Sequence, residues 1–579
     1  MKYLFLLFCT CCFFSFASAQ YSRWLIQFAD KNGTPFTISN PAAYLSVQAI
    51  QRRARQGISI DSTDLPIVPS YLNSVSAVPN VNVLNSSKWL NQVAIVITDT
   101  SALSQIQLLP FVKSIQPIAL KSRHGHQDTS STRINQSNRR LHRDTVTAET
   151  QSNTIQNIRQ ALGNFYSYGN SYAQIHIHQG EWLHNLGFHG EGITIALLDA
   201  GFFGYLTNPA FSDLINSHRV LGTYDYVNLK QSVNEENEHG AFCLSIIASN
   251  VPGTMIGTAP AAKFWLFKTE DVNSEYPVEE QNWIAAAEFA DSAGTDIIST
   301  SLGYDYFDDA SFDINYPQRD GHTSMISRAA NLAVAKGMIV TVSAGNSGDA
   351  TDESKFVDCP ADADSTLTVG ATGTNGAIVS FSSWGPNASG QIKPDVVSVG
   401  AGTAIIQSDG SPTFGSGTSF SNPNMAGLVA CLWQAFPEFN SHDIRDAVVR
   451  SSDRYTKPNN QSGYGIPNFR KAYQMLEDKR EFLIYTSNPS NPSIGIYPVP
   501  FTSDFTVVFK PTETVTGTVT VNLQLLDAIG RILESKSVQT ISNSFGSARF
   551  EKSYFLPKGV YFIHYDDGVQ KKTLKTIKQ

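Results

Sequence analysis

The sequence predicts an α/β fold for residues 166–478, with a parallel sheet covered by helices on both faces and a smaller domain at each end. Strand-like runs in this region, such as "GITIALLDA" and "GMIVTVSAGN", are apolar throughout, and helix-like segments separate them. Strands that are apolar on both sides are typical of parallel sheets, which are buried on both faces. The chain has 579 residues, too many for one ordinary core, so we expect several domains.

Two smaller units flank this sheet. Residues 20–120 alternate strand-like runs such as "RWLIQFAD" with helix-like ones such as "AAYLSVQAIQRRARQG", which predicts a small α/β domain. Residues 496–579 contain runs such as "TVTVNLQLLD" between turn residues, which predicts a small antiparallel β-sandwich. Residues 121–165 are polar and charged, and residues 479–495 include the Pro-, Ser- and Asn-rich run "TSNPSNPSIG", so we interpret both as linkers.

The first residues, "MKYLFLLFCTCCFFSFASAQ", predict a secretory signal over residues 1–19, because one lysine precedes an apolar run with a small-residue end. No later run is long enough to span a bilayer, so we expect an exported, soluble chain. The net charge of −8 argues against a nucleic-acid partner. The cysteines beyond the signal lack metal or disulfide spacing, and we interpret Cys243 and Cys431 as small buried apolar side chains.

Four chemically competent side chains come at strand ends or helix starts. Asp199 ends one buried strand, His239 begins an apolar helix, Asn346 follows another strand, and Ser419 precedes a second apolar helix. Each has an ordinary structural explanation, such as a helix N-cap for Ser419. Acyl transfer by a serine, however, needs a base, an acid that orients the base and donors for the oxyanion. The carboxyl ends of parallel strands gather such groups at one edge.

The segments "LLDAGFFG", "EHGAFCLSIIA", "SAGNSG" and "GTSFSNPNMAG", with "FSSWGPNASGQIKPDVVSVG", resemble the signature segments of the subtilisin-like serine proteases. The resemblance covers roughly residues 166–478 and implies the subtilisin-like fold and a secreted endopeptidase acting on proteins or peptides. It implies Ser419 as nucleophile, His239 as general base and Asp199 as its orienting carboxylate. Asn346 and the backbone N–H of Ser419 would then stabilise the oxyanion.

The run "STSLG" resembles the substrate-binding strand of that family, which implies substrate contacts for Ser301, Leu302, Gly303 and Tyr304. The chain also departs from the family pattern at four positions. Alanines follow the aspartate and the His-Gly pair, Phe420 follows the serine, and Asn424 directly follows the proline: Ala200, Ala241, Phe420 and Asn424. None of these changes removes a reacting group, so we expect them to affect rate and substrate preference.

Two other functions are alternatives to this one. An esterase or lipase normally presents G-x-S-x-G, but here Ser421 occupies the place of the second glycine. In that class the acid and the histidine also follow the serine, whereas Asp199 and His239 precede Ser419. A catalytically silent surface protein that uses the fold as a binding scaffold would be free to lose triad members, and none is lost. That scaffold remains the alternative.

The flanking units carry resemblances of their own. Residues 20–120 are similar in pattern to the inhibitory propeptides of the family, which implies a zymogen that binds its own propeptide. Residues 121–165 contain a basic patch that is either plain linker or a processing site, formed by Arg139, Arg140 and Arg143. Residues 496–579, with "YPVP" and "LPKGVY", resemble the sorting domain of the type IX secretion system of Bacteroidetes. That implies contact with the secretion machinery, export through the periplasm, and a secreted or cell-surface product.

No metal ligand is assigned to the site, and the chemistry needs no cofactor. Four histidines near the start of the main domain match no zinc spacing, and we interpret them as structural: His176, His178, His184 and His189. An aspartate group is either a structural calcium site or a solvated loop: Asp305, Asp308 and Asp309.

Overall fold

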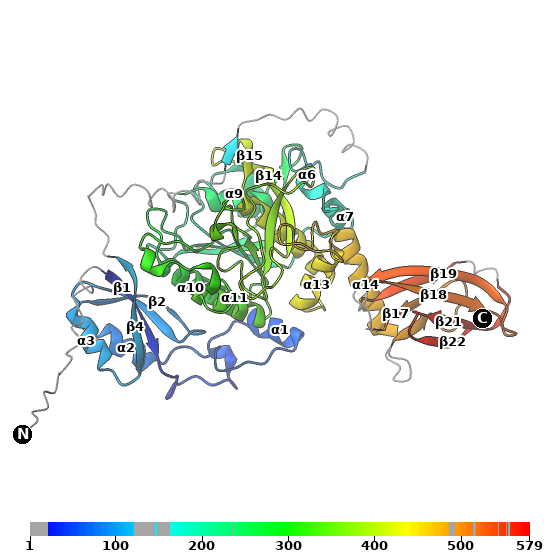
Figure 1. The fold of residues 1–579 in the computed structure, drawn as a ribbon, viewed down its shortest axis with the longest axis horizontal. Coiled ribbons are helices and arrows are strands. Elements are labelled where there is room, and N and C mark those ends of the chain that lie inside the picture. The colour runs from blue at the N-terminus through cyan, green and yellow to red at the C-terminus, as the bar shows by residue number, and fades with distance from the viewer. Residues whose placement is uncertain are drawn as a thin grey trace, which may run out of the picture.

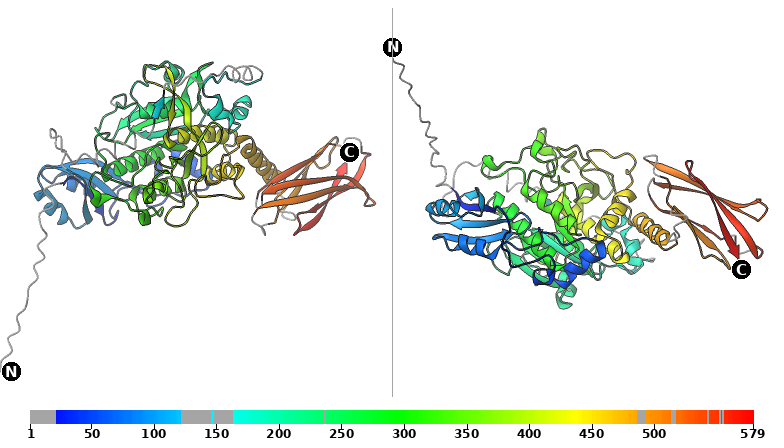
Figure 2. Two further views of the ribbon diagram at one scale, coloured as in Figure 1. Left: turned by 45° about the horizontal axis from the view of Figure 1, so that its top comes forward. Right: turned by 90° about the horizontal axis from the view of Figure 1, so that it is seen from below.

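The structure, a computed structural model, describes residues 21–120, 145–147, 163–235, 237–485, 493–512, 517–541, 544–551, 553 and 556–579. Figure 1 shows three bodies in a row, with the N-terminal domain in blue and the C-terminal domain in orange and red. Figure 2 shows from two further sides that these two domains lie at opposite ends of the central one. Within the described part of the chain, no helix is long and apolar enough to cross a membrane. The predicted signal and the arginines of the first linker lie outside the described residues.

The central domain is built on a sheet in the order β5-β15-β14-β13-β12-β11-β6-β10-β7. Pairing is parallel from β7 to β14 and antiparallel at β15 and β5, which confirms the predicted parallel α/β fold. Its strands are β5 (Thr145–Thr147), β6 (Thr194–Asp199), β7 (Val220–Asp225), β10 (Lys263–Lys268), β11 (Ile297–Thr300), β12 (Ile339–Ser343), β13 (Leu367–Gly373), β14 (Val396–Ile406) and β15 (Pro412–Ser416).

Both faces of the sheet are covered. Along β6, Ile195 and Leu197 belong to one buried apolar cluster, whereas Ala196 and Leu198 belong to another on the opposite face. The first face is covered by α9 (His239–Ala248), α12 (Thr418–Ala435), α13 (Ser441–Ser451) and α14 (Phe469–Tyr485), and the second by α10 (Pro277–Ala293) and α11 (Met325–Ala335). The smaller elements are α6 (Tyr172–His176), α7 (Gly180–Asn185), α8 (Ser212–Asn216), β8 (Asn250–Val251) and β9 (Met255–Ile256).

The N-terminal domain is a four-stranded antiparallel sheet, in the order β2-β3-β1-β4, with three helices. Leu25, Ala94 and Ile118 of this sheet share a buried cluster with residues at the start of α10. The domain therefore packs directly on the central one. Its elements are β1 (Tyr21–Phe28), α1 (Val47–Gln56), α2 (Pro69–Ser76), β2 (Val81–Ser87), β3 (Gln92–Ile97), α3 (Ser101–Gln107) and β4 (Val112–Leu120).

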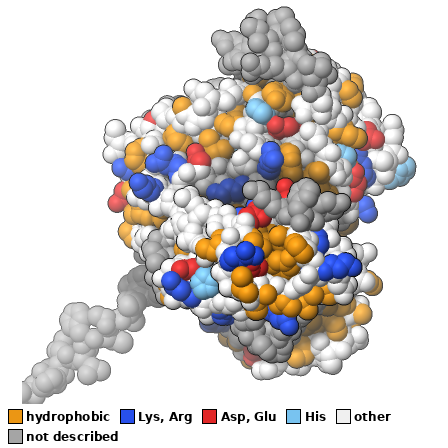
Figure 3. Space-filling model, turned by 90° about the vertical axis from the view of Figure 1, so that its right-hand side faces the viewer, with side chains coloured by type: hydrophobic (Ala, Val, Ile, Leu, Met, Phe, Trp, Pro, Cys, Tyr) orange, Lys and Arg blue, Asp and Glu red, His pale blue; other side chains and the backbone are white. Residues whose placement is uncertain are grey.

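The C-terminal domain consists of two antiparallel sheets, β16-β17-β20 and β19-β18-β21-β22, that share one core. Figure 3 faces this end of the molecule and shows hydrophobic side chains among charged ones. The exposed large apolar side chains of the domain are Val499, Ile529, Ile532, Leu533 and Val569. Its strands are β16 (Ile494–Tyr497), β17 (Phe505–Phe509), β18 (Thr518–Leu526), β19 (Ile532–Ile541), β20 (Gly546–Phe550), β21 (Gly559–Asp566) and β22 (Lys571–Lys578).

The beginning of the second predicted linker is helical instead. We predicted a linker over residues 479–495, but residues 479–485 complete helix α14. Phe482 of this last stretch is buried, and Arg480 pairs with Glu438 at 2.6 Å. Helix-forming residues with an apolar contact and an ion pair hold these last turns in place.

Candidate active site

Asp199 and His239 meet at the carboxyl edge of the central sheet. Asp199 is the last residue of β6 and His239 the first of α9, and His239 Nδ1 lies 2.6 Å from Asp199 Oδ1. Asp199 also accepts the backbone N–H of Ala200 at 2.7 Å. Both side chains are buried. A carboxylate at Nδ1 selects the tautomer whose basic lone pair is on Nε2.

Gly240 allows this close approach of helix and strand. A Cβ atom at Gly240 would lie 2.6 Å from the carbonyl oxygen of Gly201 and 3.0 Å from Cβ of Asp199. Any larger residue would push α9 away from the end of β6. The His-Gly pair in the sequence is therefore a packing requirement as well as a motif.

Ser419 is the second residue of α12, and its backbone is tied to two neighbouring elements. Its carbonyl oxygen accepts a hydrogen bond from Ser301 Oγ at 3.0 Å and one from Cys243 Sγ, on the histidine's own helix, at 3.4 Å. The ring of Phe420 lies 6.0 Å from the ring of His239, centroid to centroid. Aspartate, histidine and serine thus come together at one edge of the sheet.

Asn346 lies against the start of α12. Its Oδ1 accepts the backbone N–H of Thr418 at 2.8 Å and the hydroxyl of Thr418 at 2.9 Å. Because these bonds occupy the oxygen end of the amide, the NH2 end is the one that donates. Thr418 therefore orients the amide next to the serine, a role that sequence reasoning missed although the residue lies inside the quoted motif.

The residues expected to bind substrate differ in their surroundings. Ser301 and Leu302 follow β11 directly, beside the carbonyl of Ser419. Tyr304, in contrast, faces the interior, since its backbone N–H and carbonyl both bond to Cys359, at 2.8 and 3.1 Å. Its hydroxyl donates to Glu270, and its ring is fully buried. The backbone of Tyr304 is thus already paired with the Cys359 segment, and the expected substrate contact of Tyr304 stays a prediction.

Glu270 is a second buried group that sequence reasoning missed. It follows β10, and its carboxylate accepts the hydroxyl of Thr269 at 3.0 Å. Burial raises the pKa of Glu270 to about 7, and the nearby charge of Asp199 adds to the effect. A polar residue directly after a buried strand was the available signal, the same one that identified Asp199.

The histidines set aside as structural are bonded within the protein. His178 Nδ1 faces the carbonyl of Pro467 at 2.9 Å and Nε2 faces Ser398 Oγ at 2.9 Å. His184 faces the hydroxyl of Tyr168 at 2.7 Å and a backbone carbonyl at 3.0 Å. Burial lowers the pKa of both histidines to about 4. They are therefore neutral core side chains.

The aspartates considered for calcium bind protein groups. Asp305 pairs with Arg319 at 3.1 Å, Asp308 accepts a backbone N–H at 3.1 Å, and Asp309 accepts the hydroxyl of Tyr21 at 2.7 Å. In the described ranges, two other groups bring three potential metal ligands within 4.8 Å of one another: Asp199, His239 and Cys243, and Glu270, Glu275 and Glu279. The first of these groups contains the Asp199–His239 pair described above.

Comparison with protein families divides the chain into three matched regions. Residues 190–465 match the subtilase family, residues 23–135 match the peptidase S8 propeptide domain of Bacteroidota, and residues 495–579 match the secretion system C-terminal sorting domain. The propeptide match covers nearly all of the N-terminal α/β domain, the subtilase match lies in the central sheet domain, and the sorting-domain match coincides with the β-sandwich.

Curated relatives align with about half of the chain. Serine protease AprX of Bacillus subtilis (strain 168) is 28% identical over 297 residues, which cover 46% of this chain and 62% of the relative. The thermophilic serine proteinase of Bacillus sp. (strain AK1) is 28% identical over 286 residues, covering 49% and 62%. Subtilisin E of Bacillus subtilis (strain 168) is 26% identical over 295 residues, covering 50% and 68%. This chain thus spans about three fifths of the first two relatives. The match to the subtilase family thus lies between a match to the Bacteroidota peptidase S8 propeptide domain and a match to a secretion system C-terminal sorting domain, and the last of these indicates export.

Proposed function

We propose that this chain is the zymogen of an exported serine endopeptidase that cleaves peptide bonds through an acyl-enzyme at Ser419. The observation that carries the proposal is the contact of 2.6 Å between His239 Nδ1 and Asp199 Oδ1, on the helix whose Cys243 binds the backbone of Ser419. Names of the aligned relatives, among them a serine protease and a subtilisin, support the same reaction class.

Each group has one task in this reaction. The hydroxyl oxygen of Ser419 attacks the substrate carbonyl carbon, and Nε2 of His239 takes the hydroxyl proton. Asp199 stabilises the imidazolium that forms. The tetrahedral oxyanion accepts hydrogen bonds from the N–H of Ser419 and the Asn346 amide. His239 then gives its proton to the leaving amine, and water releases the acyl group by the same steps in reverse.

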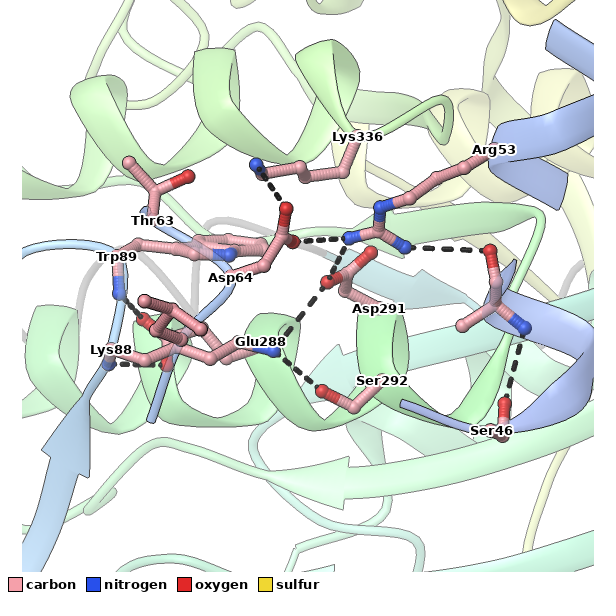
Figure 4. A network of polar contacts seen from close by, with 12 residues as sticks. Ser46, Arg53, Thr63, Asp64, Lys88, Trp89, Glu288, Asp291, Ser292 and Lys336 are labelled. Carbon is pink, nitrogen blue, oxygen red and sulfur yellow. Dashed lines mark hydrogen bonds and ion pairs between the residues drawn. The ribbon is translucent and has the colours of Figure 1, made fainter. Parts of the chain in front are cut away.

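Latency is supported by the way the N-terminal domain is held on α10 (Figure 4). Arg52 and Arg53 of α1 both pair with the carboxylate of Asp291, and all three side chains are at most 1% exposed. Glu288, one turn earlier on α10, accepts the backbone N–H groups of Lys88 and Trp89 at 2.7 and 2.9 Å. These paired buried charges would hold the N-terminal domain on the central one, because losing one partner leaves a buried charge uncompensated.

The test is labelling of the processed protein by a fluorophosphonate probe, with mass spectrometry to locate the adduct. We expect the adduct on Ser419, absent in Ser419→Ala and in His239→Ala, and unchanged in the control Ser411→Ala, a turn serine bonded to Asp409. Asn346→Ala should lower turnover by about 10²- to 10³-fold. A folded, processed sample that takes no label would refute the proposal and favour the scaffold alternative.

Export is the remaining part of the proposal. The sorting domain would direct the chain through the type IX machinery, as its family match suggests. Removal of residues 496–579 should leave the protein in the periplasm, whereas the Ser419→Ala chain should still be exported. Export of the shortened chain would contradict this role.

A further inference from the structure

A buried carboxylate, Asp358, lies between the two segments that flank the reacting groups. A Cβ atom at Gly303, in the substrate strand, would lie 2.9 Å from Oδ2 of Asp358. A Cβ atom at Gly345, which directly precedes Asn346, would lie 2.8 Å from the same oxygen. The side chain of Asp358 is 6% exposed. The carboxylate therefore approaches both segments where each has a glycine, so that no side chain separates it from them.

The carboxylate is not fully compensated by its surroundings. The buried guanidinium of Arg319 lies 3.1 Å from Asp305 but 3.8 Å from Oδ1 of Asp358, beyond hydrogen-bond distance. That oxygen of Asp358 is buried and accepts no hydrogen bond from the part of the chain that the structure describes. Two carboxylates therefore share one guanidinium, which lies closer to Asp305 than to Asp358. A buried charge of this kind is costly unless a cation joins it.

The position of the attacked carbonyl brings a substrate side chain close to Asp358. The carbonyl that Ser419 attacks must lie within reach of the Asn346 amide, and the residue that carries this carbonyl branches one bond away, at its Cα. Gly303 belongs to the expected substrate strand, Gly345 directly precedes Asn346, and Oδ2 of Asp358 lies against both glycines. A long cationic side chain directed between the glycines would meet the carboxylate.

We propose that Asp358 is a specificity-determining residue that selects arginine or lysine as the residue whose carbonyl Ser419 attacks. The proposal rests on the proposed function and names its substrate class. A guanidinium or ammonium group at Oδ2 would place a cation next to this carboxylate, whose other oxygen accepts no hydrogen bond from the described part of the chain, whereas an acidic side chain is repelled. The chain's own first linker contains residues of this class, Arg139, Arg140 and Arg143, which lie outside the described residues.

The test uses the processed protein and a set of peptides that differ only in the residue before the cleaved bond: Arg, Lys, Ala, Phe or Glu. We expect kcat/KM for Arg and Lys to exceed that for Ala and Phe by about 10²- to 10³-fold, the scale of a buried charge pair. Asp358→Asn should remove that advantage and leave kcat/KM for Ala and Phe within a few-fold of the parent. The rate of fluorophosphonate labelling at Ser419 should not change.

Asp352→Asn is the control, since it removes an exposed carboxylate six residues earlier, which accepts the backbone N–H of Ser354 at 3.1 Å, and should keep the preference for Arg and Lys. Asp358→Ser is a second variant, with the same expectation as Asp358→Asn. A parent enzyme that prefers apolar residues overturns the inference, as does an Asp358 variant that loses activity on all peptides equally while Ser419 still takes the label. Failure of the parent to label at all would instead overturn the proposed function.

Discussion

Asp291 offers the sharpest test of how the N-terminal domain is held. Its carboxylate, 0% exposed, is the partner of two guanidinium groups, Arg52 and Arg53, which are also buried. Burial alone raises the pKa of Asp291, but the charges of Arg52, Lys88 and Arg53 outweigh it and hold the pKa below its ordinary value. Asp291→Asn keeps the shape of the side chain and removes its charge, which takes the carboxylate partner from buried Arg52, whereas Arg53 keeps its second partner, Asp64, at 2.7 Å.

The expected cost is the cost of breaking a buried ion pair on one side, about 3–5 kcal/mol. At about 1.4 kcal/mol per tenfold change, the dissociation constant of the N-terminal domain should rise by roughly 10²-fold to a few thousandfold. The assay is carried out in the Ser419→Ala background, with a specific protease recognition sequence inserted between residues 121 and 144. After cutting, dissociation on dilution is followed by size-exclusion chromatography.

Asp213→Asn is the control for this experiment. Asp213 pairs with Arg219 at 2.6 Å, but its side chain is 52% exposed, so the pair contributes about 1 kcal/mol or less. A dissociation constant for Asp291→Asn no higher than that for Asp213→Asn would refute the reasoning, because it would mean that the buried network does not hold the domain. Unchanged melting of the separated central domain would show that the effect belongs to the interface.

Three further predictions concern pH and the oxyanion donor. Burial at the interface raises the pKa of Glu288 to about 7, so the N-terminal domain should bind most strongly below about pH 4.5 and less strongly as the pH rises through 7. The dissociation assay measures this pH profile, and Glu288→Gln should flatten it. Thr418→Val removes the hydroxyl bond of 2.9 Å to Asn346 and should lower kcat by about tenfold with KM unchanged; an unchanged kcat contradicts it. Burial lowers the pKa of His178 to about 4, so the stability that neutral His178 contributes is present above about pH 6.5 and is lost as the pH falls toward 4. In denaturant unfolding, the free energy of unfolding of His178→Gln should fall less over this pH range than that of the parent. An equal fall contradicts the prediction.

Much of the fold could be predicted from the sequence because its signals are local. The strand that ends at Asp199 and the helix that begins at His239 are apolar on every side, and the polar residue stands where the apolar run stops. In a parallel sheet this position alone brings the side chain to the carboxyl edge. The apolar helix after Ser419 carried the same kind of signal.

Local pattern failed where a long-range partner decides the outcome. Residues 479–485 looked like the start of a linker, but Arg480 and Phe482 contact other parts of the fold and keep them helical. The sequence near Tyr304 likewise gives no sign that its backbone pairs with Cys359. Neither contact partner is marked by anything near these residues in the sequence.

The sequence by itself determined which segments are buried strands and helices and the order in which the reacting residues occur. Only the tertiary structure decided what meets across the chain: Arg53 and Asp291 are 238 residues apart, and Asp358 lies next to glycines 55 and 13 residues earlier (358 − 303 and 358 − 345). The physical reason is that hydrophobic periodicity records whether a residue is buried, whereas the identity of its partner depends on the packing of whole elements.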